Sequence, residues 1–146
     1  MIFCDNPVFL EAATFYQNKL GIPDDCLIAI AFNSELDVAG CCFPQKTEEG
    51  LDFYMIILDP TDDDPYEDHP IEVLAHEMVH VRQYYTGQLF DFTEEVVVWN
   101  SQRYNTPAKC SDEYYFSPWE QEAFGLQRGL FNSYANWIEE CLTQKN

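Results

Sequence analysis

The sequence PIEVLAHEMVHVRQYYTG, residues 70–87, decides the fold predicted for this chain. It contains His76 and His80, four residues apart, with Glu77 directly after the first histidine. On an α-helix, residues four apart lie one above the other on the same face, so both imidazoles can reach a single metal ion. Glu77 follows about 100° further around the helix axis, where its carboxylate can act as a general base beside that ion.

The residues around this motif indicate a helix with one apolar face. His76, His80 and Gln83 lie on a different face from an apolar stripe whose members recur at spacings of three and four: Ile71, Leu74, Met78, Val81 and Tyr85. Pro70 suits the first helical position, and Gly87 suits the residue just past the end. We therefore expect a helix that is buried on one side and open on the other. The alternative is an ordinary helix with two surface histidines.

Length and composition bound the class of protein. The chain has 146 residues, of which 47% are hydrophobic and 16% aromatic, which is ample for one packed domain over residues 1–146. It carries 26 acidic and 7 basic residues, a formal charge of −19. Such a surface repels nucleic acid and anionic membranes and favours basic partners. A protein that mimics DNA is the alternative, but the acids are dispersed within a strong apolar pattern, which favours a solvated acidic surface.

Targeting signals and cysteine patterns point to the cytoplasm. The sequence has no apolar run of about 18 residues that could span a bilayer, and its first residues do not follow the pattern of a secretion signal. The six cysteines form no C-x-x-C pair, so we expect buried free thiols rather than a disulfide framework or a cysteine zinc site.

Before the motif, the sequence predicts one helix and a short sheet. The helix covers residues 7–20, with Asn6 as its cap and Gly21 at its end. Strands are expected over residues 26–32, from residue 41, and over residues 51–58, with turns between them.

The loop over residues 59–69 offers a second possible metal site. A calcium loop would use four acids: Asp62, Asp63, Asp64 and Asp68. The alternating spacing and central glycine of an EF-hand are missing, which favours a solvated loop. His69, at the end of this loop, is expected to cap the motif helix or lie on the surface.

After the motif, the sequence predicts a strand and turn followed by a long helix. The strand ends in Val96 to Trp99, and Asn100-Ser101 suggests the turn of a hairpin. Residues 106–116 are expected to be irregular. Ser117 can then cap a helix that starts at Pro118 and runs to about Thr143.

A third metal ligand is expected at the start of that long helix. A catalytic zinc takes three protein ligands, and the histidines supply two. Glu120 is the first candidate, because Ala123 lies on nearly the same face and lets the two helices approach closely. Glu122, about 200° away from Glu120, is the reserve candidate. The competing role for Glu120 is that of a capping-box acid bonded to Ser117.

These two motifs, HEMVHVRQ at residues 76–83 and PWEQEAF at residues 118–124, resemble those of gluzincin-type zincin metallopeptidases, in particular small single-domain proteins often encoded by bacteriophages. The resemblance implies an α+β fold: an N-terminal helix, a short mixed or antiparallel sheet of about three strands, the HExxH helix, and a long C-terminal helix with the third ligand. It also implies that His76, His80 and Glu120 bind Zn²⁺ and that Glu77 is the general base. The chain differs from larger relatives in lacking a sizeable second subdomain, and in Phe124, where many of them have an acid or asparagine.

The expected function is zinc-dependent hydrolysis of peptide bonds, on a peptide or protein substrate, in the cytoplasm, or in the host-cell cytoplasm if the chain is phage-encoded. Tyr114 and Tyr115 are candidates for stabilising the oxyanion, as is Arg82. Acids are expected to orient the histidines, with three possibilities: Asp52, Asp91 and Glu95. A zincin scaffold used for binding and an acidic DNA mimic are the alternatives.

Overall fold

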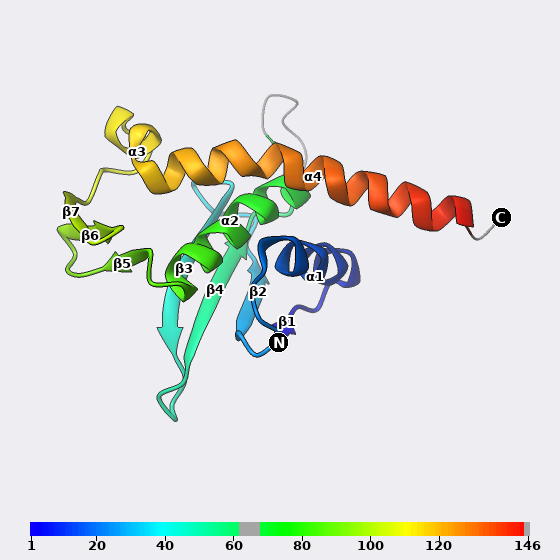
Figure 1. Cartoon of the computed structure of the whole chain (residues 1–146), viewed down its shortest axis with the longest axis horizontal. Helices are drawn as coiled ribbons and strands as arrows, with labels where there is room; N and C mark the ends of the chain where they lie inside the picture. The colour runs from blue at the N-terminus through cyan, green and yellow to red at the C-terminus, as the bar shows by residue number, and fades with distance from the viewer. Residues whose placement is uncertain (62–67, 145–146) are drawn as a thin grey trace.

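The computed structural model describes residues 1–61 and 68–144. Within these residues the chain forms four helices and two small sheets, an α+β arrangement. Figure 1 shows a central helix, α2 (Pro70–Tyr85), with a sheet behind it, α1 (Pro7–Leu20) on one side and a long helix, α4 (Pro118–Gln144), running across it. The second sheet lies at the other end of the molecule from α1.

The first sheet is mixed and has the order β1-β2-β4-β3. Its strands are β1 (Ile2–Phe3), β2 (Ile28–Phe32), β3 (Gly40–Lys46) and β4 (Asp52–Leu58). β1, β2 and β4 are parallel, whereas β3 pairs antiparallel with β4 and forms one edge. Alternate residues of β4, namely Tyr54, Ile56 and Leu58, are buried, because successive side chains of a strand point to opposite faces.

Helices α1 and α2 cover that buried face. Asn6 caps α1 by accepting hydrogen bonds from the backbone N–H groups of Val8 and Phe9, and Gly21 ends it in the left-handed conformation. Ala12 and Ala13 of α1 are fully buried, and the Tyr16 hydroxyl donates to the backbone carbonyl of Ile71 at 3.1 Å. Helix α1 thus has its predicted bounds, and α2 begins at Pro70 as predicted but ends at Tyr85, two residues before Gly87.

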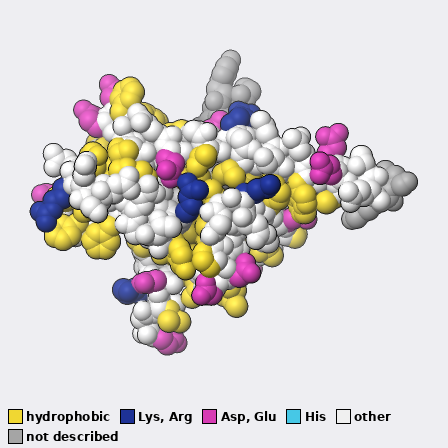
Figure 2. All heavy atoms as spheres, in the orientation of Figure 1, with side chains coloured by type: hydrophobic (Ala, Val, Ile, Leu, Met, Phe, Trp, Pro, Cys, Tyr) yellow, Lys and Arg dark blue, Asp and Glu magenta, His cyan; other side chains and the backbone are white. Residues whose placement is uncertain are grey.

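Helix α2 is buried on all sides over most of its length, so the expected open face is wrong. All residues from 70 to 81 are buried, and Gln83 beyond them is fully buried too. The sheet and α1 cover the apolar stripe, and α4 covers the face that carries the histidines. No histidine side chain shows on the face of the molecule drawn in Figure 2.

Helix α4 packs closely across α2 near its own beginning. Ala123 is 0% exposed at this crossing, as its small side chain predicted. Further along, Tyr134 packs against the rings of Phe15 and Tyr16 on α1. The last turns extend beyond the rest of the molecule (Figure 1).

The second sheet is antiparallel and packs against the start of α4. It consists of β5 (Leu89–Asp91), β6 (Val96–Trp99) and β7 (Gln102–Asn105). Asn100 and Ser101 both have positive φ angles, 49° and 67°, which is the two-residue turn of the expected hairpin. Trp119 of α4 packs its indole against Trp99 and Tyr104, so this sheet is fixed to the first turn of the helix.

Several sequence predictions need correction. The first sheet has four strands rather than about three, because β1 has only two residues and no readable pattern. Residues 106–116 are not wholly irregular, since they contain the short helix α3 (Asp112–Phe116). The capping box is also wrong: both the backbone N–H and the hydroxyl of Ser117 donate to the carbonyl of Tyr114.

Two smaller expectations concern the loop before α2 and the cysteines. His69 caps α2, because its Nδ1 accepts the Ile71 N–H at 3.1 Å. Asp62, Asp63 and Asp64 of the calcium alternative lie outside the described residues.

All six cysteines are free, as expected, but only Cys26 is buried. Among the described residues, no helix is both long and apolar enough to cross a membrane.

The α2–α4 crossing gives a test of the fold. Ala123→Leu would insert three extra carbon atoms into a fully packed contact, so we expect it to lower the free energy of unfolding by about 1–3 kcal/mol. Gly129→Ala is the matched control on the same helix, because a Cβ there meets nothing within 4 Å. It should raise stability by about 0.5–1 kcal/mol. Chemical denaturation of both variants checks this; a neutral Ala123→Leu would contradict the close crossing.

Candidate metal centre

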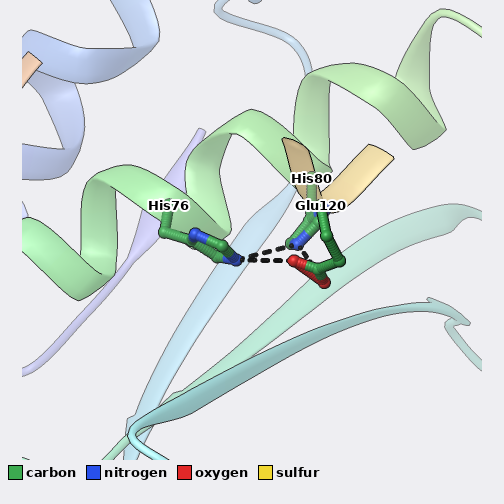
Figure 3. A group of neighbouring side chains, drawn as sticks. All are labelled: His76, His80 and Glu120. Atoms are coloured by element: carbon green, nitrogen blue, oxygen red, sulfur yellow. Dashed lines mark hydrogen bonds and ion pairs between the residues drawn. The ribbon is translucent and has the colours of Figure 1, made fainter. Parts of the chain in front are cut away.

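Three candidate ligands from two helices meet where α4 crosses α2. His76 and His80 extend from consecutive turns of α2, and Glu120 extends from the first turn of α4 toward both (Figure 3). The two Nε2 atoms are 3.2 Å apart, and the carboxylate oxygens of Glu120 lie 3.0 Å from His76 Nε2 and 3.1 Å from His80 Nε2. All three side chains are buried. Glu120 therefore faces the histidines instead of capping its own helix.

A glutamine holds His76 in one orientation. The side-chain N–H₂ of Gln127 donates to Asp68 Oδ2 at 2.7 Å and to Glu72 Oε1 at 3.4 Å, so its Oε1 must be the atom that faces His76 Nδ1 at 2.8 Å. An amide oxygen only accepts hydrogen bonds, so Nδ1 carries the proton. In the neutral ring, the lone pair then lies on Nε2 and points at the other two ligands.

A second glutamine holds His80 in the same way. Gln83 Nε2 donates to the Trp119 carbonyl at 3.0 Å and to Glu122 Oε1 at 3.2 Å, while its Oε1 accepts from His80 Nδ1 at 2.7 Å. In the neutral form of each ring, the Nε2 lone pair thus faces one point that Glu120 also faces. Two imidazoles and a carboxylate form a donor set that suits a divalent cation, so these residues fit a metal ion.

The expectation that acids orient the histidines is wrong. Amide side chains do so, and acids act only one step further out, through Gln127 and Gln83. Asp52 instead pairs with Lys46 at 2.6 Å on the exposed end of the β3–β4 hairpin. Asp91 accepts from the Tyr84 hydroxyl, and Glu95 lies in the exposed turn before β6.

Charge in the cluster is balanced by a proton when no cation is bound. Burial lowers the pKa of His80, but its hydrogen bond to Glu120 and the charge of that carboxylate outweigh burial and raise the pKa to about 9. Burial raises the pKa of Glu120, but hydrogen bonds and charge from both histidines outweigh it and hold the pKa well below the usual range. A metal ion would replace that proton, so metal affinity should fall as pH falls.

Glu77 lies beside the cluster without joining it. It is 5% exposed, and burial raises the pKa of its carboxyl, with the two histidines opposing this shift and Glu120 adding to it. A Cβ built on Gly40 of β3 would lie 3.3 Å from Glu77 Oε1 and 2.9 Å from Val73 Cγ1. Because glycine has no Cβ, Gly40 leaves room for the Glu77 side chain.

The cluster opens onto a cavity of about 250 Å³. Glu77, His80 and Glu120 line its floor. β3 lines one wall, the second sheet lines another, and the segment before α4 closes a third through residues that include Tyr114. The second sheet therefore contributes a wall that the sequence analysis did not expect.

Of the three candidates for stabilising the oxyanion, Tyr114 lines the cavity, whereas Tyr115 and Arg82 do not. Burial, with Glu120 adding to it, raises the pKa of the Tyr114 hydroxyl, so this phenol stays protonated in the cavity. Tyr115 is 45% exposed, packs against Phe124 and does not line the cavity. Arg82 pairs with Glu122 at 3.1 Å, away from the cavity, and Glu122 is therefore not part of the cluster.

Sequence reasoning missed the role of the two glutamines. Gln83 was visible on the histidine face, three residues after His80. Gln127 follows Glu120 by seven residues, which places both on one face of α4. That spacing is the signal that could have found it.

Comparisons of the chain with protein-family models, curated proteins and solved structures found no match.

Elemental analysis can separate the two glutamates of α4. We expect nearly stoichiometric zinc in the wild-type protein and its loss in His80→Ala and Glu120→Gln, because each removes one of three ligands. Glu122→Gln is the matched control, since Glu122 contacts Arg82 and Gln83 instead. Zinc retained in Glu120→Gln but lost in Glu122→Gln would exclude this ligand set.

Gln127→Leu tests the orientation of His76. Without the amide acceptor, the imidazole is free to turn, so zinc affinity should fall about 10- to 100-fold while the ligands themselves stay in place. Gln121→Leu, an exposed position on the same helix, should leave the affinity unchanged. Competition with a chelating dye measures both. Equal affinities would show that Gln127 does not position the histidine.

Proposed function

We propose that this protein is a zinc-dependent metallopeptidase of the gluzincin type. The observation that carries the proposal is the convergence of His76 Nε2, His80 Nε2 and the Glu120 carboxylate, each within 3.0–3.2 Å of another, beside a separate buried carboxylate, Glu77. Three protein ligands with an open side, plus a nearby base that is not a ligand, is the arrangement used for metal-assisted hydrolysis.

This donor set suits zinc better than calcium or magnesium. Imidazole nitrogen and a single carboxylate suit zinc, whereas calcium and magnesium need more oxygen ligands. The three groups come from two helices locked by the buried Ala123 contact, so the set is preformed. A preformed cluster with one side on a cavity supports a catalytic site over a closed structural one.

The chain's own residues have separate roles in this reaction. When bound, zinc polarises a carbonyl oxygen and lowers the pKa of a water molecule. Glu77 accepts a proton from water in the cavity and later delivers it to the leaving amine, a role that its raised pKa suits. The Tyr114 hydroxyl faces the same cavity and remains a hydrogen-bond donor, so it can stabilise negative charge on the substrate oxygen.

A binding protein built on the same scaffold is the second candidate. Phe124 favours it, because its ring packs edge-on against His76 at 4.5 Å between centroids and narrows access from that side. A DNA mimic has less support: on the face drawn in Figure 2, acidic side chains lie in separate groups between uncharged ones rather than in a continuous strip.

Glu77→Gln separates an enzyme from a binding protein. The amide keeps the shape but cannot accept a proton, so we expect peptide cleavage to fall about 10²- to 10⁴-fold while zinc content is unchanged. Glu49→Gln, an exposed change of equal charge in the β3–β4 turn, is the control. Mass spectrometry of peptide-library digests measures the rate. A fully zinc-loaded wild-type protein that cleaves nothing would favour the binding protein.

A further inference from the structure

One acid in the cavity has no role in the metal cluster. The charged side chains that line it are His80, Glu77, Glu120, Asp91 and Lys109. The first three belong to the cluster or act as its base. Asp91, at the end of β5, is solvent-exposed, and its carboxylate accepts from the Tyr84 hydroxyl at 3.2 Å. Surrounding protein still desolvates this carboxyl enough to raise its pKa, with the hydrogen bond from Tyr84 opposing the shift.

Asp91 has no cationic partner within the described part of the chain. Its one hydrogen-bonding side chain there is the neutral phenol of Tyr84. Lys109 also lines the cavity, but among the described residues it forms no ion pair with Asp91. A partly desolvated carboxylate without a cation is less stable than one with a cation, so this position favours a positive group from outside the chain.

Asp91 lies where it would contact a side chain of the substrate rather than the peptide bond that is cleaved. Tyr84 follows His80 by one helical turn on the same face of α2, and both line the cavity. The Tyr84 hydroxyl then reaches beyond that turn to Asp91. Leu89 and Val97 line the same cavity as Asp91, and their apolar side chains suit the hydrocarbon stem of a long basic residue.

Asp91 also lies where three hollows meet. It lines the main cavity and two adjoining ones, and the second of these adds another acid, Glu94. The first adjoining hollow contains Lys46, which is already paired with Asp52 at 2.6 Å. A peptide that extends from the metal cluster toward β5 thus meets Asp91 and Glu94. Of the described lysines that line the three hollows, Lys46 is paired and Lys109 lines only the main cavity.

We propose that Asp91 selects peptides with a lysine or arginine near the scissile bond, its carboxylate binding the basic side chain over the wall formed by Leu89 and Val97. This inference rests on the proposed function for the location of the scissile bond. Binding of the basic side chain itself does not require catalysis, so the two can be tested separately.

The test uses synthetic peptide pools of one length, in which a fixed position carries lysine, arginine, norleucine or glutamate. Norleucine keeps a linear hydrocarbon stem and lacks the charge. Cleavage is measured with the zinc-loaded wild-type protein, and binding with zinc-loaded Glu77→Gln, by fluorescence anisotropy. We expect lysine and arginine pools to be preferred over norleucine about tenfold in both assays. Asp91→Asn should abolish that preference, and Asp91→Glu should retain part of it.

Glu49→Gln is the control for net charge, because it removes the same charge from an exposed turn and should keep the preference. Thermal unfolding and zinc content show whether Asp91→Asn remains folded. Cleavage without a basic preference, or a preference unchanged in Asp91→Asn, would overturn the inference and leave the peptidase intact. Asp91-dependent binding without cleavage would overturn the peptidase and leave basic-peptide recognition. Neither cleavage nor binding would overturn both.

Discussion

The crossing of α4 over α2 is the contact on which the rest of this structure depends. It brings Glu120 within 3.1 Å of two histidines that belong to another helix, at a point where all three are buried. Burying a carboxylate is costly unless opposite charge and hydrogen bonds compensate. Here a proton on His80 compensates in the metal-free protein, and a cation would do so with twice the charge. The same crossing thus creates both the cost of burying the carboxylate and the donor set that fits a metal ion.

The cost of burying the Glu120 carboxylate explains the polar network around the cluster. Gln83 and Gln127 each use both ends of the amide: the oxygen accepts from a histidine, and the nitrogen donates to a carbonyl or a carboxylate. Arg128 then balances Glu72, which is 2% exposed, at 3.0 Å. No buried side-chain nitrogen or oxygen among the described residues lacks a partner. A fully satisfied network of this kind holds the imidazoles in one orientation, which a site on loops would not do.

The features that could be predicted from the sequence are those set by contacts between residues a few positions apart in the chain. Asn6, Gly21 and the proline starts define helix ends through contacts a few residues long, so those bounds were predictable. Glu120 was predictable because Ala123 marks the packed face of its helix. The burial of the histidine face was not, because amphipathic periodicity treats a polar face as solvated. In this chain the polar face of α2 meets another polar face on α4, and only tertiary structure shows that pairing. Asp91 was misassigned for the same reason: its neighbours come from α2 and β6.

The second sheet links the candidate metal cluster to the cavity wall that carries Asp91. Its strands have only three or four residues each, and Trp119 fixes it to the helix turn that also carries Glu120. The anchor of the cavity wall, Trp119, is therefore directly adjacent in sequence to the third candidate ligand, Glu120. Because Trp119 and Glu120 share a helix turn, the wall that carries Asp91 and the metal cluster are attached to the same backbone segment. The proposed preference for basic peptides depends on this attachment, since a loosely held wall would bind a basic side chain without placing the adjacent peptide bond at Glu77.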